Sequence, residues 1–587
     1  MQKNGWNLDD VCPDNKFEEL LTEAEKSIEL MEKWWEKLSK DMSLNEFKKF
    51  LEFDENVGEI FSRLGYLPML KESVDQKDTQ ARLMKTKVDN LVLKFNEKSR
   101  KVGHWLKGLP VEGKKTLDDM SASRLFKAIP DLEYGLNYAR LAAKHTLTQR
   151  EEEIIDNKDV AGGQVISDLR GLIEADFVYE LGKKKIKTQG ELMSLVHSKN
   201  PKLREGAYRA LFKKHQENSD KFFVMYQAVV RDWGFEAKIR GYDSPISVRN
   251  FANHLPDKAI ETLLKVCREE RKVFWKYFEY KGKMLKKSKL SRFDLYAPTT
   301  KIKERKYGFE ESKKMVLESF EEFSPRFANE ARKMIEENHI DWEIKKNKRS
   351  GAFCATVGPK ITPYVMLNHT NTTRDVSTLA HELGHGVHSL YANKHYASSQ
   401  HANLPLAETA STLAETIMFE KMLAKEKDIE VKRQMLSEKI GESYATILRQ
   451  AYFEIFEIEA HKMVAKGTTE KELSKLWLSG LKEQFGPGVK VDNVFRYEWM
   501  YVSHIFESPF YCYAYSFGEL LSLSLYARYK KDKGFVKQIE NLLEAGGSRD
   551  PKEILEETGV DMSDENFWRG GFEVIKGWQE QLLTTTV

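Results

Sequence analysis

The sequence has little of what marks disulfide-rich, membrane-spanning or nucleic-acid-binding proteins. Its four cysteines (Cys12, Cys267, Cys354 and Cys512) are scattered and form no CxxC pair, so we expect reduced thiols and a cytoplasmic location. The apolar runs are far shorter than the roughly 20 residues that a membrane-spanning helix needs, and no apolar core follows Lys3 as in a signal peptide. The formal net charge is only +3, from 94 basic and 91 acidic side chains, which gives no general attraction to nucleic acid or to a membrane.

Proline and glycine are also sparse in the first third of the chain, where apolar residues recur at helical spacing. A chain of 587 residues is too long for one ordinary domain. We therefore predict a helical N-terminal lobe over residues 1–190 and a second region over residues 191–587. In the first helix of the lobe, the apolar stripe is expected to contain Phe17, Leu20, Leu21, Ala24, Ile28, Leu30 and Met31.

The one clear strand pattern lies in the middle of the chain. The segments GAFCATV (351–357) and YVMLN (364–368) are short, aromatic and β-branched, and the turn-like GPKITP separates them. Helical patterns dominate the rest of the sequence. The predicted fold is therefore mainly α, with a small β-sheet beside the helix that follows.

This helix carries three histidines and one glutamate among apolar and small residues. Asn371, Thr372 or Thr373 can cap its N-terminus, and Asp375 lies in its first turn. The helix is expected to run through TLAHELGHGVHSL (378–390).

His381, Glu382 and His385 form the pattern H-E-x-x-H. Residues i and i+4 of a helix lie on one face, so both imidazoles can reach one ion, and neutral imidazole suits Zn²⁺. Glu382, next to the first ligand, can take a proton from a metal-bound water during attack on a carbonyl. The alternative is a pair of structural histidines. Gly384 and Gly386 favour the metal site, because glycine costs about 1 kcal/mol in a helix and indicates close approach of backbone or substrate.

Two histidines leave a catalytic zinc one protein ligand short. His388 is one candidate, but an i+3 histidine cannot easily join the other two around one ion. The pattern H-E-x-x-H-x-x-G-x-x-H also fails, because His388 and Tyr391 occupy its glycine and its last histidine position. Glu408 and Glu415 lie two turns apart in the apolar segment LAETASTLAET. We expect Glu408 to bind the metal, and Glu415 and Asp375 to support the ligands without contacting the metal.

The chain resembles oligoendopeptidase F, a relative of thimet oligopeptidase among the gluzincin metallopeptidases. The likeness runs from WNLDD through FDLYAP, SGAFC and DVSTLAHELGHGVH to AGGSRDP and GVDMSDENFW, and covers nearly the whole length. It implies a two-lobed helical zinc endopeptidase with a deep central cleft, in which residues 191–587 form the catalytic region. By position, His381, His385 and Glu408 match the zinc ligands of the family, and Glu382 matches its catalytic base.

The segment SHIFESPFYCYAYSFGEL is the predicted source of hydrogen-bond donors for an oxyanion. If the segment is one helix, His504, Tyr511 and Tyr515 share a face and Tyr513 points away, although Pro509 can shift this register. The alternative is an aromatic core stripe. The resemblance implies that a histidine and tyrosine hydroxyls of this region lie over the scissile carbonyl, so these three residues are predicted to be catalytic.

An exposed strand edge can bind an extended peptide through backbone hydrogen bonds, and Gly351, Ala352 and Phe353 are the candidates for this substrate contact. The predicted protein is a cytoplasmic endopeptidase with one Zn²⁺ per chain. It hydrolyses internal bonds of short unstructured oligopeptides by Glu-assisted attack of a zinc-bound water. Oligopeptides are its only predicted partners, with no nucleic acid and no membrane, and the oligomeric state is left open.

Two other functions remain compatible with the sequence. A zinc carboxypeptidase of the same gluzincin type would need a cation for the terminal carboxylate of the substrate, and Arg496 or Lys490 can provide it. A non-catalytic helical binding protein that retains the motif is the second alternative.

Overall fold

The computed structural model describes residues 5–299 and 305–584, and the chain forms two compact units. The first unit consists of Met1–Lys144, Glu304–Ala424 and Arg528–Val560, and the second of His145–Lys303, Lys425–Ala527 and Asp561–Val587. The division predicted at residue 190 falls within a helix of the second unit. The helical pattern of the N-terminal third therefore continues from the first unit into the second.

Both units are mainly helical, which confirms the predicted fold class. Among the described residues, no helix is long and apolar enough to cross a membrane. The helices of the first unit are α1 (Phe17–Lys37), α2 (Leu44–Val74), α3 (Thr79–Leu106), α4 (Asp119–Leu125), α5 (Pro130–Ala142), α14 (Phe309–Phe323), α15 (Pro325–Glu336), α16 (Thr373–Tyr391), α17 (Ala397–Gln400), α18 (Leu404–Ala407), α19 (Thr409–Lys425), α26 (Val536–Ala545) and α27 (Pro551–Glu557).

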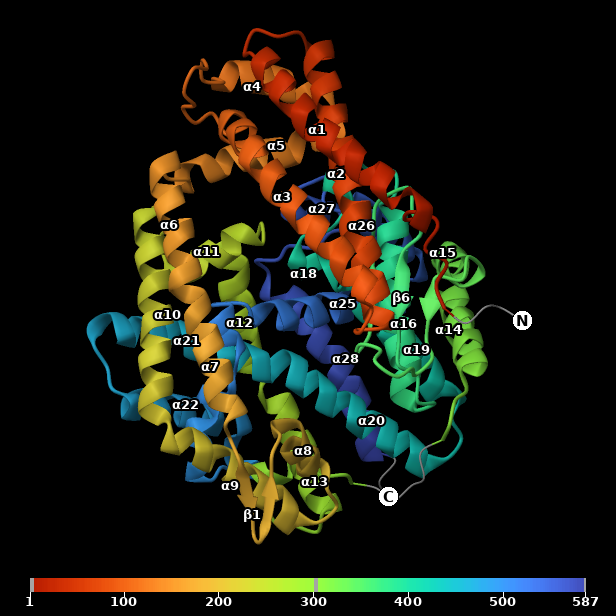
Figure 1. Ribbon diagram of the computed structural model, residues 1–587. Helices are drawn as coiled ribbons and strands as arrows, with labels where there is room; N and C mark the ends of the chain where they lie inside the picture. The colour runs from red at the N-terminus through yellow and green to blue at the C-terminus, as the bar shows by residue number, and fades with distance from the viewer. Residues whose placement is uncertain (1–4, 300–304, 585–587) are drawn as a thin grey trace. The chain divides into compact units, whose positions relative to one another are not determined.

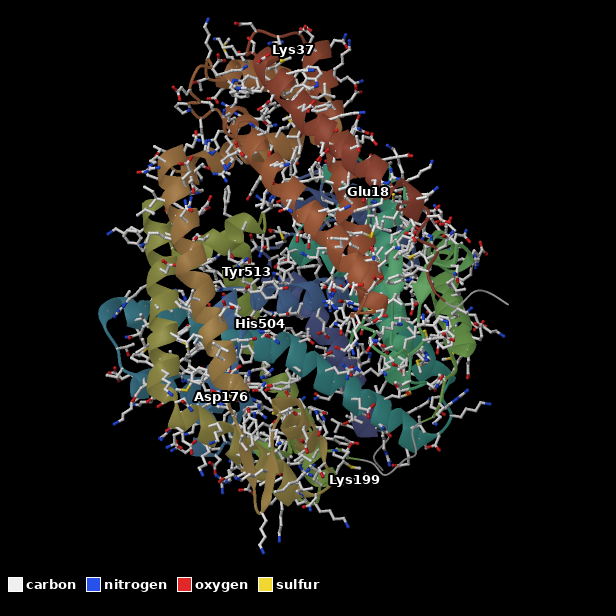
Figure 2. The ribbon with its side chains drawn as sticks, in the orientation of Figure 1. Glu18, Lys37, Asp176, Lys199, His504 and Tyr513 are labelled. Carbon is white, nitrogen blue, oxygen red and sulfur yellow. The ribbon has the colours of Figure 1, made fainter. Side chains whose placement is uncertain are left out.

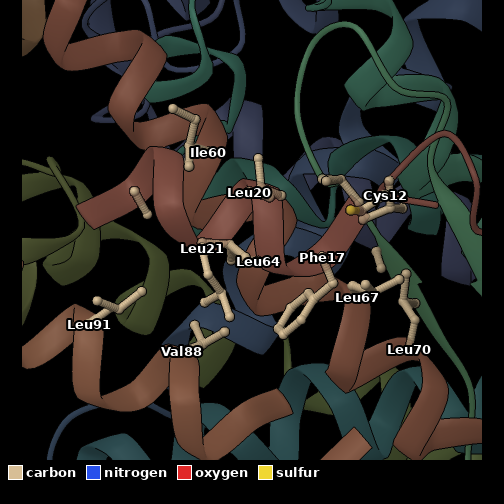
Figure 3. Packing of buried hydrophobic residues seen from close by; sticks show 14 of the residues in the cluster. Cys12, Phe17, Leu20, Leu21, Ile60, Leu64, Leu67, Leu70, Val88 and Leu91 are labelled. Atoms are coloured by element: carbon tan, nitrogen blue, oxygen red, sulfur yellow. The ribbon is translucent and has the colours of Figure 1, made fainter. Parts of the chain in front are cut away.

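The first three helices of this unit pack side by side (Figure 1). Their shared core contains Phe17 of α1, Leu64 of α2 and Leu91 of α3 (Figure 3). The predicted stripe of α1 is buried except at Leu30, which is 43% exposed. Leu30 lies 13 residues after Phe17, and an α-helix turns it about 220° away, onto the opposite face.

A small three-stranded sheet of the first unit packs against α16, as predicted. The strand order is β4 (Ile340–Asp341), β6 (Tyr364–Met366) and β5 (Phe353–Ala355), with β4 parallel and β5 antiparallel to β6. In β6, all three side chains are buried, so this central strand is covered on both faces. The strand β5 is at the edge of the sheet.

The second unit is a helical assembly with two small strand pairs. Strands β1 (Tyr179–Leu181) and β2 (Lys184–Ile186) form an antiparallel hairpin, and β3 (Leu290–Ser291) pairs in parallel with β7 (Val489–Lys490). Its helices are α6 (Gln149–Ala161), α7 (Gly163–Ala175), α8 (Gln189–Ser194), α9 (Pro201–Glu217), α10 (Ser219–Ile239), α11 (Pro245–Ala252), α12 (Asp257–Glu270), α13 (Lys272–Met284), α20 (Ile429–Ser443), α21 (Arg449–Lys466), α22 (Glu470–Phe485), α23 (Glu498–Tyr501), α24 (His504–Glu507), α25 (Tyr513–Lys531) and α28 (Glu565–Thr584).

Candidate metal centre

The helix α16 begins behind a capping box. Of the three predicted caps, Thr372 is the residue used: its side chain accepts a hydrogen bond from the Asp375 N–H. Asp375 Oδ2 in turn accepts hydrogen bonds from the N–H groups of Thr370 and Thr372, at 2.9 and 2.8 Å, and from both hydroxyls. Burial would raise the pKa of Asp375, but these hydrogen bonds lower it. Asp375 therefore anchors the start of the helix, six residues before His381.

His381, His385 and Glu408 bring three ligand atoms together. The two Nε2 atoms lie 3.1 Å apart, and Glu408 Oε2 lies 3.5 Å from His381 Nε2 and 3.4 Å from His385 Nε2. A tetrahedral site with bonds of about 2.0–2.1 Å has edges of about 3.3 Å, so these three separations fit the ligand triangle of one Zn²⁺. Two imidazoles and one carboxylate are also a donor set that catalytic zinc sites use.

Gly384 allows the Glu408 segment to approach α16 closely. A Cβ atom at Gly384 would lie 2.6 Å from Ser411 Cα and 2.8 Å from the Ala410 carbonyl oxygen. At Gly386 a Cβ would instead meet the Met334 side chain of α15, with the Sδ atom at 2.2 Å. Both glycines therefore lie close to another segment, as expected: backbone approaches Gly384, and a side chain approaches Gly386.

Glu408 lies at a break between α18 and α19, where the sequence predicted a continuous helix. Its φ and ψ angles are −83° and −2°, which end one helical segment before the next begins. The Ser411 hydroxyl hydrogen-bonds to Glu408 Oε2 at 2.8 Å, which orients the carboxylate. Sequence reasoning missed Ser411, although its i+3 position relative to Glu408 is a signal for such a contact.

Glu415 contacts the ring nitrogen of His381 that does not face Glu408. Its Oε1 atom lies 2.5 Å from His381 Nδ1, on the opposite side of the ring from Glu408. Burial alone would lower the pKa of His381, but the hydrogen bond to Glu415 and the charges of Glu415, Glu382 and Glu408 raise it to about 9. A carboxylate bonded to Nδ1 fixes the tautomer and leaves Nε2 free to bind a metal.

Glu382 is buried beside the ligand group, with 6% of its surface exposed. Burial raises its pKa to about 7, together with the negative charges of Glu408 and Glu415; the positive charge of His381 and a hydrogen bond from the Cys354 N–H oppose the shift. A carboxyl group with a pKa near neutrality is suited to accept and return a proton.

His388 is not part of the ligand group, although it lies on the same helix. Its side chain is buried, and burial lowers its pKa to about 4. The ring is therefore neutral at physiological pH and belongs to the packing beneath the site.

The predicted substrate-binding residues lie at the start of the edge strand. Gly351 has a φ of 86°, a left-handed conformation that suits glycine, and Asn368 Nδ2 donates to its carbonyl oxygen at 2.9 Å. The Phe353 ring packs against Trp6 and is partly buried against the core, while its backbone belongs to the edge strand. Ala352 lies between them and is partly exposed.

His504, Tyr511 and Tyr515 lie together in the second unit. Tyr515 Oη is 3.3 Å from His504 Nε2, and the rings of His504 and Tyr511 are stacked, with centroids 5.9 Å apart. The segment is not one helix, so the condition for the shared helical face is not met: α24 ends at Glu507, and α25 begins only at Tyr513. The turn between the helices, not helical periodicity, brings the three side chains together.

Tyr513 is fully buried and hydrogen-bonds to a side chain outside this group. Its hydroxyl accepts a hydrogen bond from Asn253 Nδ2 at 2.7 Å. Figure 2 labels the side chains of Tyr513 and His504.

Comparisons with known proteins place these features in a wider context. Residues 194–574 match the model of Peptidase family M3. An oligoendopeptidase F homolog of Borreliella burgdorferi is 28% identical over 569 residues, which are 93% of this chain and 92% of that protein.

Solved structures share the fold along nearly the full length. A crystal structure from Chlamydophila abortus superposes with a TM-score of 0.86 at 22% identity, and covers 99% of this chain and 98% of its own. The structure of oligoendopeptidase-F from Enterococcus faecium superposes with a TM-score of 0.71 at 22% identity, over 97% of this chain and 99% of its own.

Proposed function

The chain belongs to peptidase family M3 and is a metallo-oligopeptidase, and on this premise we propose that it is a zinc endopeptidase in which Glu382 assists the attack of water on internal peptide bonds. The observation that carries the proposal is the triangle of His381, His385 and Glu408, with edges of 3.1 to 3.5 Å. When bound, Zn²⁺ supplies a Lewis acid that polarises the scissile carbonyl and makes a water molecule more acidic.

Glu382 is proposed as the general base. It lies next to His381 in sequence and outside the ligand triangle, so its carboxylate is available for proton transfer. Its pKa of about 7 matches a group that takes a proton from the attacking water and returns it to the leaving amine. The Cys354 N–H of β5 donates to this carboxylate, which supports a position of Glu382 beside the edge strand.

The edge strand is proposed to hold the substrate backbone. β5 pairs with β6 on one side only among the described residues, and an extended peptide can add to the other side. Backbone pairing along Gly351, Ala352 and Phe353 would orient a peptide without reading its side chains. This mode of binding suits an enzyme that acts on many short sequences.

His504, Tyr511 and Tyr515 are proposed to stabilise the oxyanion that forms during the attack. Hydrogen-bond donors aimed at this charge contribute several kcal/mol in enzymes that cleave amides. The contact between Tyr515 Oη and His504 Nε2 supports a joint role, because each group orients the other.

A cytoplasmic location is part of the proposal. All four cysteines are free thiols, and three of them are buried. Thiols persist in this state in a reducing compartment.

The test uses a quenched fluorescent peptide that is blocked at both ends. Chelator-treated protein should be inactive, and one equivalent of zinc per chain should restore cleavage at an internal bond. Failure of zinc to restore activity would contradict the proposal, and cleavage that requires a free C-terminus would favour the carboxypeptidase. The oligopeptide preference is tested by placing the same sequence in a long unfolded polypeptide, where kcat/KM should fall sharply.

A further inference from the structure

The turn between α24 and α25 contains a strained residue. Phe510 has a φ of 57°, in the left-handed region that a bulky side chain adopts only when its surroundings enforce it. Tyr511 follows Phe510 directly, and His504 and Tyr515 lie on either side of the turn. The conformation of the turn therefore determines where these three side chains lie.

Two glutamates of α21 hold this turn by its backbone. Glu457 Oε1 accepts a hydrogen bond from the Phe510 N–H at 2.9 Å, and Glu454 Oε2 accepts one from the Tyr513 N–H at 3.2 Å. Both glutamates are completely buried. Residues three apart lie on one face of a helix, so the spacing of the two carboxyl groups matches the spacing of the two N–H groups.

Side chains of α11 and the residue after it hold the same turn from another side. Arg249 Nε donates to the Pro509 carbonyl oxygen at 3.1 Å. Asn253 Nδ2 donates to Tyr513 Oη at 2.7 Å. Hydrogen bonds to backbone carbonyl and N–H groups thus fix the turn before and after Phe510, in addition to the contact of the Tyr513 side chain.

Burying these two glutamates lowers the stability of the fold, so packing alone does not explain them. Glu454 Oε1 and Glu457 Oε2 have no hydrogen-bond partner among the described residues. Burial raises the pKa of both groups, and the charge of Glu454 raises that of Glu457 further, against the hydrogen bonds from the turn and the charge of Arg249. Each unpaired oxygen of a buried acid lowers the stability of a fold, and an apolar pair would avoid this cost but leave the N–H groups of the turn without acceptors. The contribution of the two glutamates is therefore to fix the backbone of the turn. The ionisable groups that face the pair are Arg249 of α11, Tyr226 of α10, Cys512 of the turn and His461 of α21.

We propose that Glu454 and Glu457 are positioning residues that hold the left-handed turn at Phe510 and thereby aim His504, Tyr511 and Tyr515 at the oxyanion. The inference rests on the function proposed for those three residues. The two glutamates act through the turn and do not touch the substrate.

The experiment compares three substitutions of one glutamate in the full-length, zinc-loaded protein. Glu457→Gln keeps an acceptor at the same reach, Glu457→Asp keeps the carboxyl group on a shorter side chain, and Glu457→Leu removes the acceptor. We expect kcat on the blocked peptide to fall on the order of 10- to 100-fold for Leu and Asp, with KM and zinc content unchanged, because a small misplacement of catalytic groups has this effect. The glutamine variant should keep a rate near that of the wild type.

Hydrogen–deuterium exchange reports on the turn without any reference to activity. The peptide that contains Phe510 should exchange faster in Glu457→Leu and Glu457→Asp, and at the wild-type rate in Glu457→Gln. Ser524→Ala is the matched control, because it removes one buried hydrogen bond of α25, to the Phe567 carbonyl oxygen, far along the helix from the turn. This variant should keep both kcat and the exchange rate of the turn.

Two results distinguish the inference from the function on which it rests. If Tyr515→Phe and His504→Ala keep the wild-type kcat, the oxyanion role itself is wrong. If these two variants are slow while folded Glu457→Leu and Glu457→Asp keep the wild-type kcat, the oxyanion role stands and the positioning role is wrong. A glutamine variant as slow as the leucine variant would also overturn it, since length and acceptor are then not what matters. If the leucine variant does not fold, the kcat and exchange rate of the aspartate variant provide the test.

Discussion

His381 Nδ1 lies 2.5 Å from Glu415 Oε1, and the other nitrogen of the same ring, Nε2, lies 3.5 Å from Glu408 Oε2. One imidazole therefore lies between two carboxylates of the same segment, one at each ring nitrogen. Glu408 Oε2 lies near the Nε2 atoms of both histidines, whereas Glu415 Oε1 lies at the Nδ1 atom of His381. This difference supports the proposal that Glu408 binds the metal and that Glu415 hydrogen-bonds to a histidine ligand.

Glu408→Ala and Glu415→Ala should lose zinc to different extents. Loss of a direct ligand should leave the site unable to retain the metal during gel filtration. Loss of the carboxylate behind His381 should weaken affinity about 10–100-fold, the usual effect of such partners. Titration against a chelator of known affinity measures both. Retention of zinc by Glu408→Ala together with its loss from Glu415→Ala would reverse the assignment.

Gly384→Ala should destabilise the first unit although alanine is the better helix former. A Cβ at this position meets the Ser411 backbone at 2.6 Å, and backbone cannot move aside without shifting Glu408. We expect a loss of about 1–3 kcal/mol, as for other overpacked sites, together with weaker zinc binding.

The matched control is Gly58→Ala in α2, where nothing lies within 4 Å of the new Cβ. This change should increase stability by about 0.5–1 kcal/mol. Thermal unfolding of both variants tests the contrast, and equal shifts would show that the close approach to Ser411 has no energetic consequence.

The loop between α16 and α17 should make stability depend on pH. His395 Nδ1 hydrogen-bonds to the Asp131 carboxylate of α5, and His395 Nε2 lies 2.6 Å from the Glu544 carbonyl oxygen. Burial opposes the charged ring, but these two hydrogen bonds and the charge of Asp131 raise the pKa of His395. A raised folded-state pKa contributes stability that is complete below the unfolded value of about 6.5 and is lost as the pH rises through the folded value.

His395→Gln should therefore lower the melting temperature more at pH 5.5 than at pH 8.5. The Asp131 carboxylate does not change this sign, because its pKa is lowered and it stays charged at both pH values. Melting curves of wild type and variant at the two pH values provide the measurement. A difference that is larger at pH 8.5 would contradict the linkage.

Tyr515→Phe and His504→Ala should lower kcat with little change in KM. A donor to the oxyanion acts mainly in the transition state, so its loss should reduce the rate and spare substrate binding. Steady-state kinetics on the blocked peptide separates the two constants. An unchanged kcat for both variants would return His504 and Tyr515 to a role in aromatic packing.

The ligand spacing was the part of the site most open to prediction. His381 and His385 are separated by one helical turn, and helix geometry alone places both on one face. The cap Thr372 is one of three candidates that the sequence predicts, because hydrogen bonds between neighbouring residues decide where a helix begins. Gly384 predicts that another part of the molecule approaches the helix closely, but the sequence does not identify Ser411 as that part.

Features that depend on contacts between distant segments were not predictable. The break at Glu408 interrupts a segment with a good helical pattern, at the point where Ser411 lies close to the α16 backbone at Gly384. The turn at Phe510 needs Glu457, 53 residues earlier in the chain, to satisfy its N–H group. Sequence periodicity reports on local structure and predicts neither the break at Glu408 nor the partner of the Phe510 N–H group.

The most direct test of the account is hydrolysis by metal-replete Glu382→Gln. Glutamine keeps the size of the side chain but cannot accept a proton, so the variant should bind one zinc ion and the blocked peptide as the wild type does. Its kcat should fall by several orders of magnitude, because the general base alone is lost. A zinc-loaded Glu382→Gln protein that keeps substantial activity would contradict the assignment of Glu382 and the mechanism built on it.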